Sequence, residues 1–429
     1  MILFTNVTTL NDSNLYVAVD GVYITYISPD KPDGEFLRGQ KFDRVIDCKN
    51  RLMLPGLYNT HTHAAMTLLR GYGEDLPLQR WLEERIFPAE DKLAEPDVYA
   101  ASMLAAAEMI SGGTVSFTDM YMFCSATARA AAETGLKANI SRPLLSFDDA
   151  QPLRENPRFD EAAALYADWH NACDGRIKID MSLHAEYTNT ERCCREIAEY
   201  SKSIGARMHI HLSETKKEHE EGKARRGKTP ARFMYDCGVF DSPTTAAHCV
   251  WLEDSDLPLL REKGVSVAHN PVSNLKLGSG VMPYSKFKNA GLNIALGTDG
   301  AASNNTLDIL KEMYIAALIH KGVNFAPDSV TAADVIRSAT VCGAVAQGRD
   351  DCGALEVGRR ADLILLDMDS VNNLPSHNPS YTAVYSANRG DVRLTMVDGN
   401  ILYENGQFTT LDIEKIKAEM RYTCAKTFN

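Results

Sequence analysis

The stretch Leu57-Tyr-Asn-Thr-His-Thr-His63 decides the fold. It ends a predicted strand in two histidines, where an open doubly wound sheet usually carries a glycine-rich phosphate loop. Downstream, helical segments stop at glycine, which commonly ends a helix, and short strands follow. Counting the first stretch, these strands number about eight: TVSFTDM (114–120), LKANIS (136–141), IKIDMSLHAEY (177–187), ARMHIHL (206–212), TTAAHCV (244–250), VSVAHN (265–270) and LNIALGTD (292–299). Strands that alternate with helices form parallel βαβ units, so the sequence predicts a (β/α)8 TIM barrel of the α/β class.

The two ends of the chain have a different texture from the middle. The first fifty or so residues alternate short β-prone runs with turn residues. Near the other end, Asp398-Gly399 and Asn405-Gly406 are strong hairpin-turn signals. We therefore predict a small composite β-sandwich domain built from residues 1–54 and 357–429, with the barrel spanning residues 55–356.

Composition narrows the class of protein. Among 429 residues, 57 acidic against 45 basic side chains give a net charge of −12, which disfavours nucleic acid and anionic membranes as partners. The ten cysteines are scattered without a CxxC motif, which favours reduced thiols. The start of the chain lacks signal-peptide features, and no apolar run reaches the roughly 18 residues that span a bilayer. We expect a cytoplasmic protein and leave open whether it forms a homo-oligomer.

Histidines at strand ends predict a metal site. Side chains two apart in a strand share a face, so His61 and His63 can both bind one ion. A second pair, His209 and His211, ends another predicted strand, and one of its members could join the same ion. All strands of a parallel barrel end at the same mouth, so side chains distant in sequence can converge there.

Three further strands carry the same kind of residue to the mouth. They end at His248, His269 and Asp299, and Glu214 follows the second histidine pair by a short turn. Burying so many polar groups is costly unless a shared ion and a substrate satisfy them together. Nitrogen and oxygen ligands without a thiolate suit zinc, and also iron or manganese. A divalent ion lowers the pKa of water, a first carboxylate accepts the proton and a second passes protons to the substrate; Asp299 suits the first role and Glu214 the second.

Several motifs together resemble the amidohydrolase superfamily, and within it the branch that deaminates 5′-methylthioadenosine and S-adenosylhomocysteine. They are PGLYNTHTH (55–63), HLSE (211–214), AHCV (247–250), HNPVSNLKLG (269–278) and LGTDGAASNN (296–305). The resemblance covers almost the whole chain. It implies one divalent metal ion per subunit, Zn²⁺ first with Fe²⁺ or Mn²⁺ as alternatives, held by His61, His63, His211 and Asp299. A single ion is favoured because the fourth strand ends in His184, whereas binuclear relatives need a modified lysine at the end of a middle strand.

The same resemblance implies the catalytic roles. Glu214 would protonate the ring nitrogen N1 and relay protons to the leaving ammonia. His248 would orient the attacking hydroxide and steady the developing alkoxide. His209 is then structural, because the family's ligand matches the second histidine of the pair. The rest of the charge-dense stretch up to Lys228 is interpreted as a solvated helix and loop.

Substrate contacts are also implied. The stretch from Thr67 to Leu93 is too long for a simple connection and predicts a functional lid or pocket wall. Similarity to the branch places Trp81 against the substrate and Glu90 on the ribose hydroxyls, where a carboxylate can accept both protons. Arg142 and His184 align with residues of the branch's substrate pocket.

Two departures from the branch concern its specificity. Glu186 stands where the branch usually has proline, and we expect it to add negative charge beside the pocket. A further arginine of the branch has no clear counterpart after Arg142, because Arg154 is displaced. Recognition of the homocysteine carboxylate is therefore left open at this point.

The leading hypothesis is hydrolytic deamination of an adenosine-like nucleoside to its inosine analogue and ammonia. 5′-Methylthioadenosine, S-adenosylhomocysteine, 5′-deoxyadenosine and adenosine are the candidate small-molecule substrates. A second hypothesis keeps the metal and acts on another heterocycle, as a deaminase or chlorohydrolase of guanine, cytosine or a triazine. A third is a barrel without catalysis that serves as a binding or scaffold protein.

Overall fold

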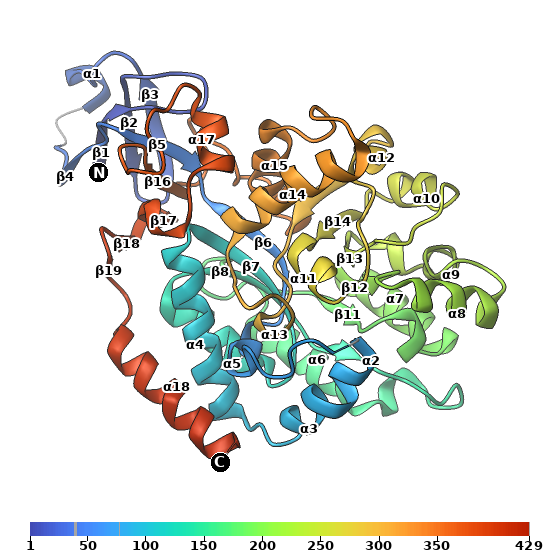
Figure 1. The fold of residues 1–429 in the computed structure, drawn as a ribbon. Coiled ribbons are helices and arrows are strands. Elements are labelled where there is room, and N and C mark those ends of the chain that lie inside the picture. Colours follow the sequence, from blue (N-terminus) through green and yellow to red (C-terminus); the bar gives the residue numbers. More distant parts are fainter. Residues whose placement is uncertain (38–40, 77, 429) are drawn as a thin grey trace.

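Parallel strands form the predicted barrel at the centre of the molecule (Figure 1). Among the described residues they number eight, in two hydrogen-bonded sheets. The computed structural model describes residues 1–37, 41–76 and 78–428. The third and fourth strands are each interrupted by one residue, Arg142 and Asp180. In chain order the strands are β6 (Leu57–Thr62), β7 (Thr114–Met120), β8 (Lys137–Ser141) continued by β9 (Pro143–Leu144), β10 (Ile177–Ile179) continued by β11 (Met181–Leu183), β12 (Met208–Leu212), β13 (Thr244–His248), β14 (Ser266–His269) and β15 (Asn293–Leu296).

The barrel closes between its last and first strands. The Asp299 amide donates to the His61 carbonyl at 2.9 Å, and the Thr60 hydroxyl donates to the Leu296 carbonyl at 2.8 Å. This approach needs glycine in the stretch Leu296-Gly-Thr-Asp299, because a Cβ on Gly297 would lie 2.9 Å from the His61 nitrogen. The closure therefore brings the metal-type ligands of the first and last strands next to each other.

Helices cover the outside of the barrel (Figure 1). Two of them end as predicted at a left-handed glycine, α5 at Gly135 with φ +89° and α7 at Gly205 with φ +68°. The barrel helices are α4 (Glu95–Ser111), α5 (Cys124–Thr134), α6 (Pro157–Trp169), α7 (Glu191–Ile204), α8 (Lys216–Arg226), α9 (Pro230–Asp236), α10 (Leu257–Glu262), α11 (Pro271–Lys276), α12 (Tyr284–Asn289), α13 (Ala301–Asn304), α14 (Ile309–Asn324), α15 (Ala332–Ala339) and α16 (Val341–Ala346).

Both ends of the chain contribute to a second unit, a β-sandwich. One sheet, in the order β3-β2-β1-β4, consists of β1 (Ile2–Val7), β2 (Leu15–Asp20), β3 (Tyr23–Ser28) and β4 (Arg44–Asp47). The other, in the order β19-β18-β17-β16-β5, consists of β5 (Arg51–Pro55), β16 (Leu363–Asp367), β17 (Val392–Val397), β18 (Asn400–Glu404) and β19 (Gln407–Phe408). The predicted hairpin turns at Asp398-Gly399 and Asn405-Gly406 join the last three strands. Side chains from both sheets, such as Phe4 and Met396, share one apolar core.

The remaining helices connect these units. After β16, α17 (Pro379–Tyr385) packs against α14 and α15, while the last helix, α18 (Ile413–Phe428), lies along α4 (Figure 1). Lys426 of α18 forms an ion pair with Asp97 of α4 at 2.8 Å. The domain boundaries at 54/55 and 356/357 stay a prediction.

The segment predicted as a lid or pocket wall folds into short helical turns. These are η1 (Ala64–Leu69), α2 (Leu78–Trp81), the π-helical turn η2 (Leu82–Ile86) and α3 (Phe87–Glu90); residue 77 lies outside the described residues. Four other short turns are η3 (Leu153–Glu155), η4 (Glu186–Thr188), η5 (Val239–Asp241) and η6 (Arg389–Asp391), and α1 covers Gly34–Leu37.

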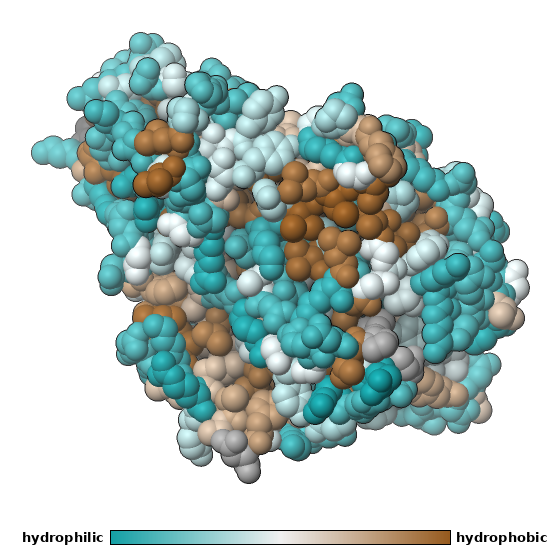
Figure 2. All heavy atoms as spheres, viewed as in Figure 1, coloured by the Kyte–Doolittle hydropathy of each residue, from teal (hydrophilic) through white to brown (hydrophobic). Residues whose placement is uncertain are grey.

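The surface has a mixed character. On the viewed face, hydrophilic side chains cover most of the area and hydrophobic ones gather near its centre (Figure 2). Within the described ranges, every helix is too short or too polar to cross a membrane. All ten cysteines are free thiols, in agreement with the sequence-based expectation.

Candidate active site at the barrel mouth

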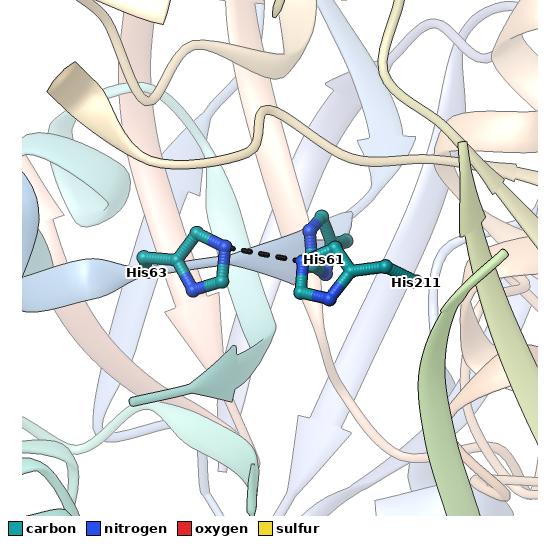
Figure 3. Close-up of side chains that lie close together, drawn as sticks. All are labelled: His61, His63 and His211. Atoms are coloured by element: carbon teal, nitrogen blue, oxygen red, sulfur yellow. Dashed lines mark hydrogen bonds between the residues drawn. The ribbon is translucent and has the colours of Figure 1, made fainter. Parts of the chain in front are cut away.

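The predicted ligand and catalytic residues meet where the barrel strands end. His61 and His63 come from the end of β6, His211 from β12, His248 from the end of β13 and Asp299 from just after β15. The rings of His61, His63 and His211 turn toward one another (Figure 3). Their ligand atoms lie within 4.8 Å of one another, and the same limit holds for His61, His248 and Asp299.

Individual distances show how tightly the group is packed. The Nε2 atoms of His63 and His211 are 3.4 Å apart. Asp299 Oδ1 lies 3.2 Å from His63 Nε2 and 3.4 Å from His61 Nε2. Three ring nitrogens and a carboxylate oxygen therefore face one point, which is the donor set of a catalytic zinc-type site.

A second layer of contacts fixes the direction of each ring. The outer nitrogen of His61, Nδ1, shares a hydrogen bond of 2.9 Å with His209 Nε2, and His211 Nδ1 donates to the His184 carbonyl at 2.8 Å. His63 Nδ1 donates to the Met120 carbonyl. Partners on Nδ1 turn the Nε2 atoms inward, as in metal sites where the outer nitrogen is anchored. His209, for which we predict a structural role, contacts the outer nitrogen of His61 and lies on the side of that ring away from the cluster.

Asp299 is held in one orientation by its neighbours. Its backbone has φ +63°, a left-handed conformation that aspartate tolerates better than most residues. The hydroxyls of Ser273 and Ser303 donate to its Oδ2 at 2.7 and 2.9 Å. Its other oxygen, Oδ1, is consequently left to the histidines.

Burial sets the protonation of the cluster. It lowers the pKa of His61 to about 4, and burial together with the other imidazoles lowers the pKa of His211 well below its usual value. Burial would also lower the pKa of His63, but contact with Asp299 outweighs it and raises this pKa to about 9. His61 Nε2 is buried with no hydrogen-bond partner among the described residues. The neutral imidazoles of His61 and His211, together with the unpartnered Nε2 atom of His61, fit a divalent ion.

Glu214 and His248 stand beside this cluster. The His248 Nε2 atom lies 4.0 Å from Glu214 Oε2, and Asn274 fixes the His248 ring by accepting from Nδ1 at 2.8 Å. The Ser279 hydroxyl donates to Glu214 Oε1 at 3.2 Å. Two carboxylates thus lie close to the His248 ring: Glu214 Oε2 at 4.0 Å from Nε2, and Asp299, whose ligand atom lies within 4.8 Å of those of His248 and His61.

A model of the amidohydrolase family matches residues 52–402. The chain belongs to the amidohydrolase family. It is 42% identical over 411 residues to a 5-methylthioadenosine/S-adenosylhomocysteine deaminase of Acetivibrio thermocellus. The aligned residues cover 95% of this chain and 93% of that relative. It is 44% identical over 383 residues to a 5′-deoxyadenosine deaminase of Methanosarcina acetivorans, and the alignment covers 88% of this chain and 87% of that relative.

The fold of this amidohydrolase also matches solved structures. A crystal structure of an adenosine deaminase from Xanthomonas campestris with bound zinc superposes with a TM-score of 0.92. The two sequences are 30% identical, and the match covers 99% of this chain and 98% of the other. The family resemblance and the barrel fold expected from the sequence are confirmed.

Among the predicted substrate residues of this amidohydrolase, Glu90 lies close to the histidine cluster. The Tyr121 hydroxyl donates to Glu90 Oε1 at 2.7 Å, and the Tyr121 ring centroid lies 6.3 Å from that of His63. Burial raises the pKa of Glu90 despite this bond. Trp81 is buried at 6% exposure in an apolar cluster that includes Met66.

The other two predicted substrate residues differ in their surroundings. The His184 ring centroid lies 5.0 Å from that of His211, and burial lowers the pKa of His184 to about 4. Arg142 donates from Nε to Glu161 on α6. Arg158, also on α6, donates to the Pro143 carbonyl at 3.4 Å and interacts electrostatically with Arg142, His184 and Glu90.

Three residues near the site were not predicted from the sequence: Arg158, Tyr121 and Glu218. Arg158 is half-buried beside Arg142, whereas Arg154, the candidate considered, is exposed. Tyr121 directly follows strand β7, so a search of strand ends for tyrosine would have found it. Glu218 is buried at 7% exposure, which corrects the expectation that the stretch after Glu214 is wholly solvated.

The expectation for Glu186 was wrong. Its side chain is fully buried, and its two oxygens accept from Arg225 at 2.6 Å and Arg226 at 2.7 Å. Two guanidinium groups from α8 thus neutralise the carboxylate, so it adds no uncompensated charge beside the pocket. Its position ties the loop after β11 to the helix that follows Glu214.

Proposed function

We propose that this amidohydrolase hydrolyses the C6 amino group of adenosine-like nucleosides, giving the inosine analogue and ammonia. The observation that carries the proposal is that His248 lies close to two carboxylates, Asp299 and Glu214, beside three converging histidines. Hydrolytic deamination needs one group that accepts a proton from water and another that delivers protons to the ring and the amine. Deaminases of such nucleosides among the relatives support the same substrate class.

We further propose one divalent ion per subunit, most simply Zn²⁺, with Fe²⁺ or Mn²⁺ as alternatives. His61, His63, His211 and Asp299 would hold it, and the neutral state of His61 and His211 favours such binding. When bound, the ion lowers the pKa of water toward neutrality. The fourth strand ends in His184, so it offers no lysine for a second ion.

The protein groups then divide the proton transfers. Asp299 accepts the proton that the attacking water loses, because its Oδ1 faces the cluster while Ser273 and Ser303 occupy Oδ2. Glu214, protonated at the start, gives its proton to N1 of the purine. It then takes the second proton of the added oxygen and relays it to the departing amine, and the proton held by Asp299 restores Glu214. His248 presents Nε2 to the oxygen that attacks C6, because its Nδ1–H donates to Asn274. In the neutral ring Nε2 orients the attacking water by accepting a hydrogen bond from it, and a ring that gains a proton can donate from Nε2 to the developing alkoxide.

Glu90 would bind the two ribose hydroxyls. Tyr121 donates to one of its oxygens and leaves the other lone pairs for vicinal hydroxyl groups. Trp81 would pack on the nucleoside, and His184, being neutral, can accept or donate a hydrogen bond near His211. We propose that the partner of this site is a free nucleoside substrate in the cytoplasm. We assign no role to nucleic acid or to a membrane.

Arg142 and Arg158 would recognise the carboxylate of S-adenosylhomocysteine. Burial, together with the neighbouring Arg142 guanidinium, lowers the pKa of Arg158, so a bound carboxylate would relieve an unfavourable pair of charges. Replacing Arg158 with methionine should raise KM for S-adenosylhomocysteine at least tenfold and change KM for 5′-deoxyadenosine less than twofold. Arg154→Met, at an exposed position nearby, is the matched control. Equal effects on both substrates would contradict this assignment.

A substrate panel tests the proposed function. Metal-loaded protein is incubated with the four adenosine derivatives and with guanine, cytosine and chlorinated or aminated triazines, and ammonia is measured alongside the ultraviolet spectrum. We expect turnover of the adenosine derivatives above all others. Preference for another heterocycle would favour the second hypothesis, and no turnover of any member would favour a binding protein.

A further inference from the structure

The turn that carries Glu214 has an unusual backbone. Strand β12 ends at Leu212, and α8 begins at Lys216 with Thr215 as its cap. Between them Ser213 has φ +48°, in the left-handed region that residues with a Cβ rarely adopt. Such a conformation persists only where its surroundings hold it in place, and it is common where a catalytic group must be aimed.

Glu218 holds this turn with both of its carboxylate oxygens. Oε1 accepts the Ser213 amide at 2.9 Å, and Oε2 accepts the Glu214 amide at 2.7 Å. Two consecutive amides pointing at one carboxylate form an anion-binding concavity of the kind known as a nest. Glu218 therefore fixes the backbone of the residue proposed to donate the proton.

A second contact supports the same turn from outside. The Ser213 hydroxyl lies 3.5 Å from His219 Nδ1, and His219 Nε2 lies 3.3 Å from Glu253 Oε1. Ser279 meanwhile donates to the Glu214 carboxylate itself at 3.2 Å. The side chain of Glu214 is thus directed by Ser279, while its backbone depends on Glu218.

We propose that Glu218 is a positioning residue for Glu214, acting through the two amides and without touching the substrate. The proposal rests on the proposed function, because it assumes that Glu214 is the proton donor. A displacement of about 1 Å in a catalytic group can lower a rate by about a hundredfold, so loss of the two-amide contact should appear in kcat.

The placement of Glu218 is costly unless it has such a role. Its side chain is buried, and burial, together with the charge of Glu214, raises its pKa to about 7. His248, Tyr187 and Cys249 are the other titratable groups that interact with it electrostatically. A glutamine at this position would avoid the buried charge, but it has one acceptor oxygen and could satisfy only one of the two amides.

Glu218→Gln is the direct test, because the substitution keeps the size of the side chain. We expect kcat for 5′-deoxyadenosine to fall at least tenfold while KM and metal content stay within threefold of the wild type. Glu220→Gln on the exposed side of the same helix is the matched control and should keep kcat within twofold. Glu218→Ala removes both acceptors and should lower kcat further, by at least a hundredfold.

Other outcomes overturn the proposal. It fails if Glu218→Gln keeps kcat within twofold, or if the loss follows metal content or KM, since that would mark a general structural role. Crystal structures of the wild type and of Glu218→Gln separate it from the proposed function. If the wild type deaminates no member of the panel, the function fails, while a turn at Ser213-Glu214 that shifts by 1 Å or more in the variant still supports the positioning role. An unchanged turn overturns it.

Discussion

The two ends of the barrel both bury charged or titratable groups, but they satisfy them differently. At the end where the strands begin, Lys137 is 1% exposed and forms ion pairs with Asp362 and with Asp398, the latter at 2.7 Å. At the end where the strands finish, His61 is fully buried, and its Nε2 atom has no hydrogen-bond partner among the described residues. Lys137 is thus paired within the chain, whereas at the second end Asp299 raises the pKa of His63 but the Nε2 atom of His61 stays unpartnered and is available to the proposed metal ion.

The pKa shifts follow the same contrast. Burial alone would lower the pKa of Lys137, but Asp362 outweighs it, so the pKa is raised and the lysine stays charged. Burial dominates at His61 and lowers its pKa to about 4, so this imidazole is neutral. A paired buried charge is typical of a structural feature, whereas neutral imidazoles that converge on one point, as those of His61 and His211 do, are typical of a functional site.

The largest effect is expected at the mouth, from Asp299→Asn. Asparagine tolerates the left-handed backbone at this position, so the change removes the charge with little strain. Metal content should fall markedly and deamination should fall at least about a thousandfold. Elemental analysis and kinetics on one sample measure both. The free energy of unfolding of the metal-free protein should also fall, because Asp299 raises the pKa of His63 to about 9 and the variant loses this contact. If the variant kept its full metal content and more than a tenth of wild-type activity, the functional role assigned to Asp299 at the barrel mouth would be contradicted.

The opposite pattern is expected at the other end, from Lys137→Met. The substitution leaves the buried Asp362 without the cation it pairs with. The Tyr58 hydroxyl at 3.3 Å, the Asp398 amide at 2.9 Å and the Cys352 thiol, which also contact this carboxylate, carry no positive charge. Removing one partner of a buried pair costs about 3–5 kcal/mol of unfolding free energy. Denaturant titration should show that loss, and kcat of the folded fraction should stay within twofold. A large loss of kcat without a loss of stability would show that the two ends are not separate in function.

A smaller, pH-dependent effect is expected from Glu312, which lies under the mouth. It is fully buried and accepts from Asn304 at 2.7 Å and from the Val272 amide at 3.1 Å, and burial raises its pKa to about 8. The folded state therefore keeps a proton that the unfolded state releases above its ordinary pKa of 4.5. The contribution to stability is present at low pH and is lost as pH rises toward 8.

Glu312→Gln removes this titration. Between pH 5.5 and 7.5 the free energy of unfolding of the wild type should fall relative to that of the variant by about 2–3 kcal/mol, at about 1.4 kcal/mol per pH unit. Denaturant titrations of both proteins at the two pH values give the difference. The same pH slope in both proteins would show that Glu312 is charged in the folded state.

Most of the fold, and the convergence of the candidate ligands, is predictable because the signals are local. A strand that ends in His61-Thr-His63 presents both imidazoles on one face, and the strand-then-helix pattern places every strand end at one mouth. Arg158 escapes prediction because only the packing of α6 brings it beside Arg142. Glu218 escapes because it lies in a charge-dense stretch in which other charged residues, such as Lys217 and Glu220, are exposed, and only the fold shows that it accepts from the turn at Ser213-Glu214.

Chelation followed by reconstitution tests the central claim most directly. The protein is stripped of metal, assayed with 5′-methylthioadenosine, and assayed again after one equivalent of Zn²⁺ is added. The site described above predicts no turnover in the stripped protein, and after addition one ammonia for each inosine analogue formed. Undiminished turnover by the metal-free protein, or no turnover of any adenosine derivative after the site is filled, would contradict it.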